Sequence, residues 1–205
     1  GASAFSPLYP ALIALLGRLL AGRYLLAALL ISNAAAVGML TLLHRLVTLH
    51  HSPRLADRTL IALVLFPTSF YLLAPYTESL FLLLVLGSFL AADRGHWPLA
   101  GVACALATLA RWQGVLVAPA LGWLVLEQIR AGRPWRDWRH WTLGDWRRWL
   151  PALWLALIPL ALLGTFAYLR GIRGLPLPWE ALRAEWEGTF TWPWRSVART
   201  ALAFA

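Results

Sequence analysis

Two charged side chains stand in short polar breaks between long apolar runs, and their types could do chemistry together. Glu78 lies in the break from Ala74 to Ser79, and Arg111 opens the break Arg111-Trp112-Gln113-Gly114. An acidic side chain at the depth of a bilayer costs roughly 2.5 to 3.5 kcal/mol, so a site that keeps one is a functional candidate. The alternative is that Glu78 only caps a helix at a water interface.

A guanidinium beside a carboxylate suits group transfer from a phosphate-bearing donor. The Arg can hold a phosphate through charge-assisted bonds and stabilise it as it leaves. The carboxylate can take the proton from an attacking hydroxyl, or orient another group that does. Sugar transfer through an oxocarbenium-like transition state needs both roles. The same two charges would also suit an ion pair in a transporter or lipid flippase, so the pair by itself leaves both classes open.

The composition indicates that these residues belong to an integral membrane protein. Hydrophobic residues make up 60% of the 205 residues, charged residues make up 13%, and the mean hydropathy is +0.64. These values are too apolar for a soluble domain of this size. The net charge of +9 lies largely between apolar runs, where anionic lipid headgroups are the expected partners. We therefore expect membrane lipids as partners and no nucleic acid.

The apolar runs predict an all-α polytopic membrane protein with about six transmembrane helices in this chain. A crossing helix needs about 20 mostly apolar residues, or fewer when it is packed within a bundle. A shorter stretch, Pro10 to Ala21, contains Gly17 and Arg18 and is expected to be a surface-lying or re-entrant helix. The six predicted spans are Tyr24–Leu43, Thr59–Leu73, Ser79–Ala92, Trp97–Ala110, Gln113–Leu126 and Trp149–Leu169.

Alternating these spans places the polar elements of the chain on two sides. Ten of the 18 basic residues, all Arg, fall in the segments 44–58, 93–96 and 127–148, and the positive-inside rule makes that side cytoplasmic. The breaks at Glu78 and Arg111 then share the extracytoplasmic side with Phe5-Ser6-Pro7-Leu8-Tyr9-Pro10 and the tail from Arg170. Polar backbone at membrane depth is tolerated where it lines a wet cavity, so these elements are expected to roof one site. Ordinary interhelical loops are the alternative.

The chain is expected to divide into a transmembrane bundle, 1–169, and an extracytoplasmic loop with the start of a further helix, 170–205. Within the bundle, the 127–148 segment is rich in Trp and Arg, which is typical of a cytoplasmic anchor in the headgroup layer; recognition of a lipid substrate is the alternative. Because the chain begins without Met and ends in an apolar stretch, we expect it to be a segment of a longer protein.

Other residues argue against further chemistry. Cys104 is the single cysteine, so no disulfide framework is possible within the chain, and a packing role is expected. His44, His50 and His51 have too few acidic neighbours in sequence to predict a metal site. Gly101 and Ala105 are four residues apart, the small-residue spacing that lets helix backbones approach closely.

Three motifs carry a resemblance to a known family. Phe5-Ser6-Pro7-Leu8-Tyr9-Pro10 is similar to an FFPLYP element, Tyr76-Thr77-Glu78-Ser79-Leu80-Phe81 to a Y-S/T-E-S-L-F element, and Arg111–Gly114 to an R-x-x-G turn. Together they resemble the PIG-V-like mannosyltransferases, relatives of the second mannosyltransferase of GPI-anchor assembly that include bacterial members. Their order and approximate spacing also match.

The resemblance implies a GT-C type glycosyltransferase of the bacterial plasma membrane with an extracytoplasmic active site. Such an enzyme transfers a sugar, typically mannose, from a polyprenyl-phosphate donor to a glycan or lipid acceptor, and needs no cofactor or obligatory metal. Glu78 and Arg111 map onto motif positions as catalytic candidates, with Tyr9, Tyr76 and Gln113 as candidate substrate-binding neighbours.

The chain departs from the family pattern in two places. Ser6 stands where the family motif has an aromatic residue. The catalytic Asp expected in the first extracytoplasmic loop would precede Gly1, since the first acidic residue here is Asp57. The general base is therefore expected outside this segment. A structural membrane subunit without chemistry is the third hypothesis, and it would be favoured if the upstream loop carried no carboxylate.

Overall fold

The computed structural model of the chain describes residues 6–130, 149–174, 176–177 and 180, and the regular secondary structure within them is helical. By its contacts the chain divides into two compact units. One comprises Phe5–Thr165, and the other comprises Gly1–Ala4 with Phe166–Ala205. The division falls inside a helix, α10, Leu157–Ala167. The expectation of a boundary after residue 169 stays a prediction.

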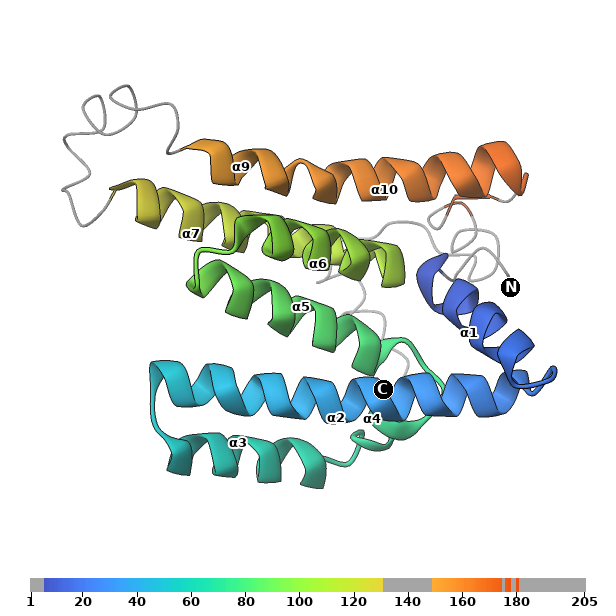
Figure 1. Cartoon of the computed structure of the whole chain (residues 1–205), viewed down its shortest axis with the longest axis horizontal. Coiled ribbons are helices and arrows are strands. Elements are labelled where there is room, and N and C mark those ends of the chain that lie inside the picture. Colours follow the sequence, from blue (N-terminus) through green and yellow to red (C-terminus); the bar gives the residue numbers. More distant parts are fainter. Residues whose placement is uncertain (1–5, 131–148, 175, 178–179, 181–205) are drawn as a thin grey trace, which may run out of the picture. The chain divides into compact units, whose positions relative to one another are not determined.

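The larger unit begins with four helices of very different lengths. α1 covers Leu8–Leu19 and packs on α2, which covers Tyr24–His50. Helix α3 covers Pro53–Leu65, and a single short turn, α4, covers Phe70–Leu73. Figure 1 shows α3 lying alongside α2, with α4 near the middle of α2.

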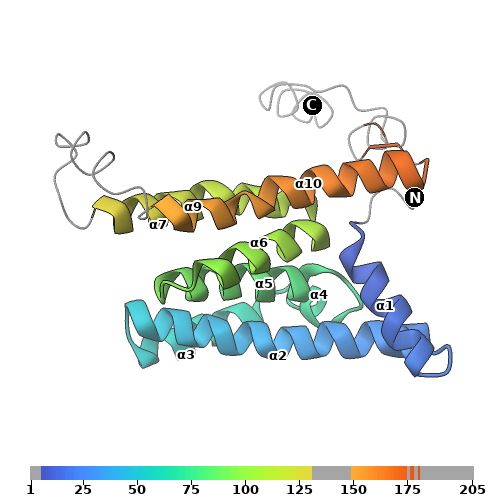
Figure 2. The same cartoon turned by 45° about the horizontal axis from the view of Figure 1, so that its top comes forward.

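The next helices carry the two charged breaks at their ends. α5 covers Glu78–Asp93 and α6 covers Trp97–Ala110. A 3₁₀ turn, η2, Trp112–Val117, then leads into α7, Ala118–Arg130. After the gap in the described residues, α9 covers Leu150–Leu155 and continues into α10. Figure 2 shows α5 lying between α2 and α6, so the helix that begins at Glu78 is central to this unit.

The core of the larger unit has two parts at different places along α5 and α6. One cluster forms around Ala92, Trp97, Cys104, Leu121 and Ile158. The other joins Tyr9, Ala35, Leu80 and Ala110, close to the charged breaks. The expected packing role of Cys104 is confirmed, since its side chain is fully buried.

The smaller unit is described over few residues. A single π-helical turn, η5, Tyr168–Ile172, follows α10. Arg170 Nη1 donates to Glu180 Oε1 at 3.1 Å, and the Leu177 amide donates to Glu180 Oε2 at 2.9 Å.

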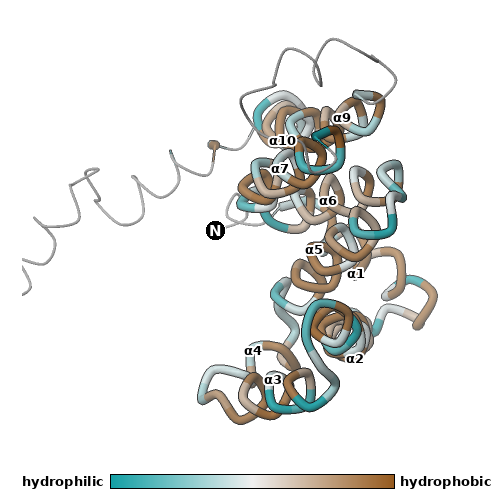
Figure 3. The backbone as a smooth tube through the Cα atoms, turned by 90° about the vertical axis from the view of Figure 1, so that its left-hand side faces the viewer, coloured by the Kyte–Doolittle hydropathy of each residue, from teal (hydrophilic) through white to brown (hydrophobic). Residues whose placement is uncertain are grey.

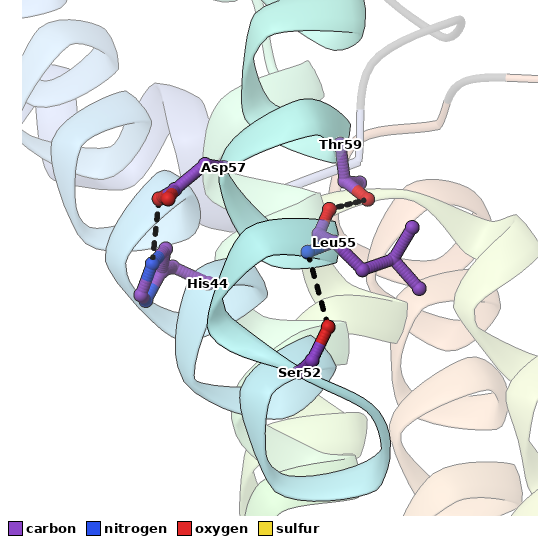
Figure 4. Close-up of polar contacts among 5 residues, drawn as sticks. All are labelled: His44, Ser52, Leu55, Asp57 and Thr59. Carbon is purple, nitrogen blue, oxygen red and sulfur yellow. Dashed lines mark hydrogen bonds and ion pairs between the residues drawn. The ribbon is translucent and has the colours of Figure 1, made fainter.

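The connection between α2 and α3 is a tight turn rather than a loop. Ser52 precedes Pro53, a position that disfavours helical backbone, and its Oγ accepts the Leu55 amide at 3.3 Å as the N-cap of α3. His44 on α2 contacts Asp57 on α3 at 3.2 Å, as Figure 4 shows. The predicted span ended at Leu43, whereas α2 continues to His50 and α3 starts at Pro53, so most of the 44–58 segment is helical.

Length and composition favour a membrane protein, but the predicted count of six spans is not supported. Two described helices are long and apolar enough to cross a membrane, Tyr24–His50 and Leu150–Gly171. Figure 3 shows hydrophobic residues along the helices. Large apolar side chains are also exposed, such as Leu25, Val37 and Ile61. Soluble monomers rarely expose extensive apolar surface, so a lipid environment fits these helices.

Two of the other predicted spans do not form one continuous α-helix. The Thr59–Leu73 run is broken, because Phe66 is extended (φ −66°, ψ 136°) ahead of Pro67. The Gln113–Leu126 run begins with a 3₁₀ turn before α7. Ser79–Ala92, by contrast, agrees with α5 to within one residue at each end. Apolar runs predicted where these helices lie, but hydropathy does not report whether the backbone stays helical.

Other boundaries agree with the sequence. Trp97–Ala110 is α6 as predicted, and α2 begins at Tyr24. The predicted Pro10–Ala21 helix is α1, shifted by two residues. Trp149–Leu169 corresponds to the helix Leu150–Gly171. Most of the 127–148 segment and most of the tail lie outside the described residues.

The expected close approach at Gly101 is confirmed and yields a stability prediction. A methyl group added at Gly101 would meet the backbone of Trp154 on α9, including its carbonyl carbon at 2.9 Å. Backbone cannot swing aside, so Gly101→Ala should lower the free energy of unfolding by about 1 to 3 kcal/mol. The measurement is chemical unfolding of the detergent-solubilised full-length protein.

Gly122→Ala on α7 is the matched control for that experiment. Nothing lies within 4 Å of a methyl group at Gly122, so the substitution should be neutral or stabilising by up to about 1 kcal/mol through helix propensity. Equal effects of the two substitutions would contradict the close approach of α6 and α9.

Candidate functional site

Glu78 and Arg111 form an ion pair at neighbouring helix ends. Glu78 is the first residue of α5, and Arg111 follows the last residue of α6. Arg111 Nη1 lies 2.5 Å from Glu78 Oε1, and the two side chains are 33% and 32% exposed. The expectation that the two residues are neighbours is confirmed, while their catalytic role stays a prediction.

The R-x-x-G turn aims Arg111 at this position. Arg111 leaves the helix in extended conformation (φ −149°, ψ 127°), while its amide still donates to the Ala107 carbonyl at 2.8 Å. The Gly114 amide returns to the Arg111 carbonyl at 2.8 Å. A methyl group at Gly114 would come within 2.6 Å of the Thr108 amide nitrogen. Only glycine therefore lets η2 fold back against α6 and hold Arg111 at the helix end.

Part of the guanidinium group of Arg111 is available for a ligand. Its Nη1 also reaches Thr77 Oγ1 at 3.4 Å, and its carbon lies 6.0 Å from the centre of the Phe81 ring. Arg carries five N–H donors, and among the described residues Nε and Nη2 have no protein acceptor. Those donors form the edge with which Arg recognises a phosphate in bidentate fashion.

The carboxylate of Glu78 has one oxygen in use and one unpaired. Glu78 lies in the first turn of α5, directly after the N-cap Thr77, where the helix dipole favours a carboxylate by roughly 0.3 to 1 kcal/mol. Glu78 Oε2 is buried and has no hydrogen-bond donor among the described residues. A buried acceptor without a donor costs roughly 1 to 3 kcal/mol, which makes this oxygen a candidate contact for a ligand.

The turn that precedes Glu78 is held by two adjacent polar residues of α2. Ser32 Oγ donates to the Tyr76 carbonyl at 3.1 Å, and Asn33 Nδ2 donates to the Leu73 carbonyl at 3.2 Å. Tyr9 on α1 completes this network, with its hydroxyl 2.7 Å from Ser32 Oγ and 3.3 Å from the Ala28 carbonyl. These bonds connect α1 and α2 to the backbone that positions the carboxylate.

The three predicted substrate-binding residues lie around the pair in different settings. Tyr9 is 5% exposed, and this burial raises the pKa of its phenol. The hydrogen bond to Ser32 lowers the pKa by a smaller amount, and the negative charge of Glu78 raises it slightly. Tyr76 is exposed and its ring packs edge-on against Tyr71 at 5.4 Å. Gln113 is the second residue of η2 and is half-buried. Their binding roles stay predictions.

The structure adds residues that the sequence did not single out. Ser32 and Asn33 support the turn, while Thr77 and Phe81 contact Arg111. One signal was available for the first two, because Ser32 and Asn33 form a polar pair inside the apolar run Tyr24–Leu43. Polar side chains in such a run are expensive unless they are hydrogen-bonded.

Two histidines of the described residues pair with carboxylates. His50 Nε2 lies 2.7 Å from Asp93 Oδ2, and His44 pairs with Asp57. Within the described ranges, no group of three or more His, Cys, Asp or Glu side chains is arranged to hold a metal ion.

Comparison with characterised proteins gives a partial likeness to a mannosyltransferase. Over 66 residues the chain is 39% identical to GPI mannosyltransferase 2 of Yarrowia lipolytica (strain CLIB 122 / E 150). The alignment covers 32% of this chain and 18% of that relative, so the matched stretch spans less than a fifth of the relative's length. No protein-family model matches the chain, and no solved structure matches it.

The support of the turn by Ser32 can be tested through stability. Ser32→Ala would leave the Tyr76 carbonyl without its donor and the Tyr9 hydroxyl with only its longer bond to the Ala28 carbonyl, so we expect a loss of about 1 to 3 kcal/mol in the free energy of unfolding. The measurement is chemical unfolding of the full-length protein in detergent.

Ser88→Ala is the matched control, since Ser88 is a fully buried serine on α5. Its hydroxyl donates to Val85 in its own helix, so its loss leaves no donor or acceptor outside that helix unpaired. The expected change is within about 0.5 kcal/mol. A Ser32→Ala protein as stable as Ser88→Ala would show that the turn does not need Ser32.

Proposed function

We propose that this chain is part of a membrane mannosyltransferase of the GT-C type, using a polyprenyl-phosphate-linked donor. The carrying observation is the ion pair of Glu78 and Arg111 with its unused hydrogen-bonding groups, one carboxylate oxygen and one guanidinium edge. The 39% identity to GPI mannosyltransferase 2 over 66 residues supports sugar transfer. The ion pair alone would suit a transporter or lipid flippase equally well. The likeness to a mannosyltransferase is what favours sugar transfer.

Arg111 holds the phosphate of the donor in this proposal. Its Nε and Nη2 donors bind two phosphate oxygens, while Nη1 remains on Glu78. As the bond between the sugar and the phosphate breaks, negative charge grows on the leaving oxygen, and the guanidinium stabilises it there. The turn around Gly114 and the Thr77 contact keep the group in place beforehand, so little reorganisation is needed.

Glu78 receives the acceptor hydroxyl. The hydroxyl oxygen forms a bond to the anomeric carbon, and the bond from that carbon to the phosphate oxygen breaks. The polyprenyl phosphate leaves with the bonding electron pair. The hydroxyl proton passes to a carboxylate, which is Glu78 in the simplest arrangement or the Asp that the family resemblance places upstream of Gly1.

The remaining assignments follow from the same proposal. Tyr76 and Gln113 border the pair and contact donor or acceptor, and Tyr9 supports them from α1. The site faces the extracytoplasmic side of a bacterial plasma membrane, as the distribution of Arg residues suggests. The acceptor is a glycan or a lipid, and no cofactor takes part.

Substitution of Arg111 tests the proposal. Removing one preorganised donor group costs on the order of 100- to 1,000-fold in rate, so Arg111→Ala should lower kcat by that factor. Arg111→Lys keeps the charge but loses the planar fork of donors. Its kcat should therefore lie between those of the wild-type protein and Arg111→Ala. The assay is transfer of radiolabelled mannose from polyprenyl-phosphate mannose to membrane lipid extract by the full-length protein.

Arg94→Ala provides the control, since Arg94 follows the opposite end of α5 and is exposed. It should retain wild-type transfer. Full activity of Arg111→Ala, with correct folding shown by its unfolding midpoint, would overturn the role given to Arg111. Absence of mannose transfer by the wild-type protein from this donor would overturn the proposed function itself.

A further inference from the structure

A cavity lies on the side of Glu78 formed by α3, the break after it, and α4. Its volume is about 270 Å³. Its walls are mainly apolar, with Leu63 from α3, Phe66, Tyr71 and Leu72 from the following segment, and Leu82 from α5. Glu78 is its charged wall residue.

The break in the helical run Thr59–Leu73 forms part of this cavity. Two hydroxyl residues of the break, Thr68 and Ser69, line it, and Ser69 Oγ donates to the Val64 carbonyl at 2.7 Å. Non-helical backbone within an apolar run is tolerated where it lines a cavity. The interruption therefore not only turns the chain but also leaves space next to the carboxylate of Glu78.

Glu78 can turn its unpaired oxygen toward that space. Oε1 is bonded to Arg111, whereas Oε2 is buried without a donor. The terminal torsion of a glutamate side chain has a broad energy minimum, so a small rotation presents Oε2 to a ligand while Oε1 keeps the guanidinium.

We propose that this cavity is the acceptor subsite, and that it takes an uncharged alcohol whose hydroxyl donates to Glu78 and whose adjacent apolar body lies between α3, α4 and α5. The identification of this alcohol as the acceptor rests on the proposed function.

The charges determine which hydrogen-bond donor fits. An ionised carboxylate only accepts hydrogen bonds, so the ligand must bring a donor. The carboxylate charge is already balanced by Arg111 at 2.5 Å, so an ammonium group would add an uncompensated positive charge to an apolar site. A hydroxyl supplies the donor without adding charge.

The walls and the volume determine the rest of the ligand. Five apolar or aromatic side chains surround the space, and burial of apolar surface is the main source of affinity there. Sites for whole drug-sized ligands have volumes of roughly 300 to 1,000 Å³, so a cavity of about 270 Å³ takes only the part of the alcohol next to its hydroxyl.

Photoaffinity labelling of the full-length protein in lipid nanodiscs tests this subsite without relying on transfer. The probe is decanol carrying a diazirine, compared with its methyl ether and with the matching decylamine. The ether has the same apolar body but no O–H donor. A hydrogen bond to a charged group corresponds to a preference of about 10- to 100-fold, so the alcohol should label the cavity residues at correspondingly lower concentration than the ether.

Filling the cavity gives the second arm. Leu82→Trp should abolish labelling of the cavity and raise the KM for a hydroxyl acceptor at least tenfold, with the KM for the donor unchanged. Phe89→Trp is the matched control, since Phe89 lies on the same helix but lines a different cavity, of about 470 Å³, beside His50 and Asp93. It should leave labelling unchanged. Leu63→Trp replaces Leu82→Trp if the latter does not fold.

The outcomes separate the two proposals. Equal labelling by alcohol and ether would mean a plain lipid groove, and stronger labelling by the amine would mean an anionic site; either result overturns the inference. Selective labelling by the alcohol in a protein that transfers no mannose would retain an alcohol site and reject the proposed function. Mannose transfer with an unaltered acceptor KM in Leu82→Trp would retain the function and reject the subsite.

Discussion

The ion pair between Glu78 and Arg111 is the constraint on which the arrangement of the central helices depends. Each residue stands at a helix end, and each side chain is only about one third exposed. Removing one partner from such a site leaves the other charge without compensation. The free energy lost in this way is larger than the net free energy that the intact pair contributes. The start of α5 and the end of α6 are therefore held together, and the turns that present the two side chains must keep their geometry.

The backbone around the pair shows how that geometry is kept. The turn before Glu78 would leave carbonyl groups unpaired within an apolar surrounding, and Ser32 and Asn33 of α2 supply donors to two of them. After Arg111, the close fit of Gly114 on Thr108 performs the corresponding task, together with a weak bond from Cys104 Sγ to the Gly114 carbonyl at 3.8 Å. One side of the pair is thus fixed by polar contacts from another helix and the other by steric fit within its own turn.

The sequence predicted the convergence of these elements better than the helices that carry them. Glu78 and Arg111 were identifiable because charge is rare in apolar runs, and α6 was predicted to the residue. The break after α3 was missed because Phe66 and Pro67 stand in a run whose hydropathy does not change. Ser32 was missed for a different reason, since its partners Tyr9 and Tyr76 lie 23 and 44 residues away along the chain. The local sequence pattern shows that a polar residue lies in an apolar run. It does not show which distant residue forms the hydrogen bond that offsets the cost of burying it.

Carboxylates at both ends of α5 explain how a mainly apolar helix keeps its position along its axis. In a lipid environment, apolar helix faces have little preference for one another over lipid, so apolar packing alone allows neighbouring positions. Glu78 pairs with Arg111 at the first residue of α5, and Asp93 pairs with His50 of α2 at the last. A shift by one residue would move the helix about 1.5 Å and turn it about 100°, which would disrupt both pairs at once. The dipole favours the carboxylate at the N-terminus and disfavours the one at the C-terminus, so Asp93 depends more on its partner. The axial position of α5, and with it the aim of Glu78 at Arg111, is therefore set by two polar contacts at opposite ends of the helix.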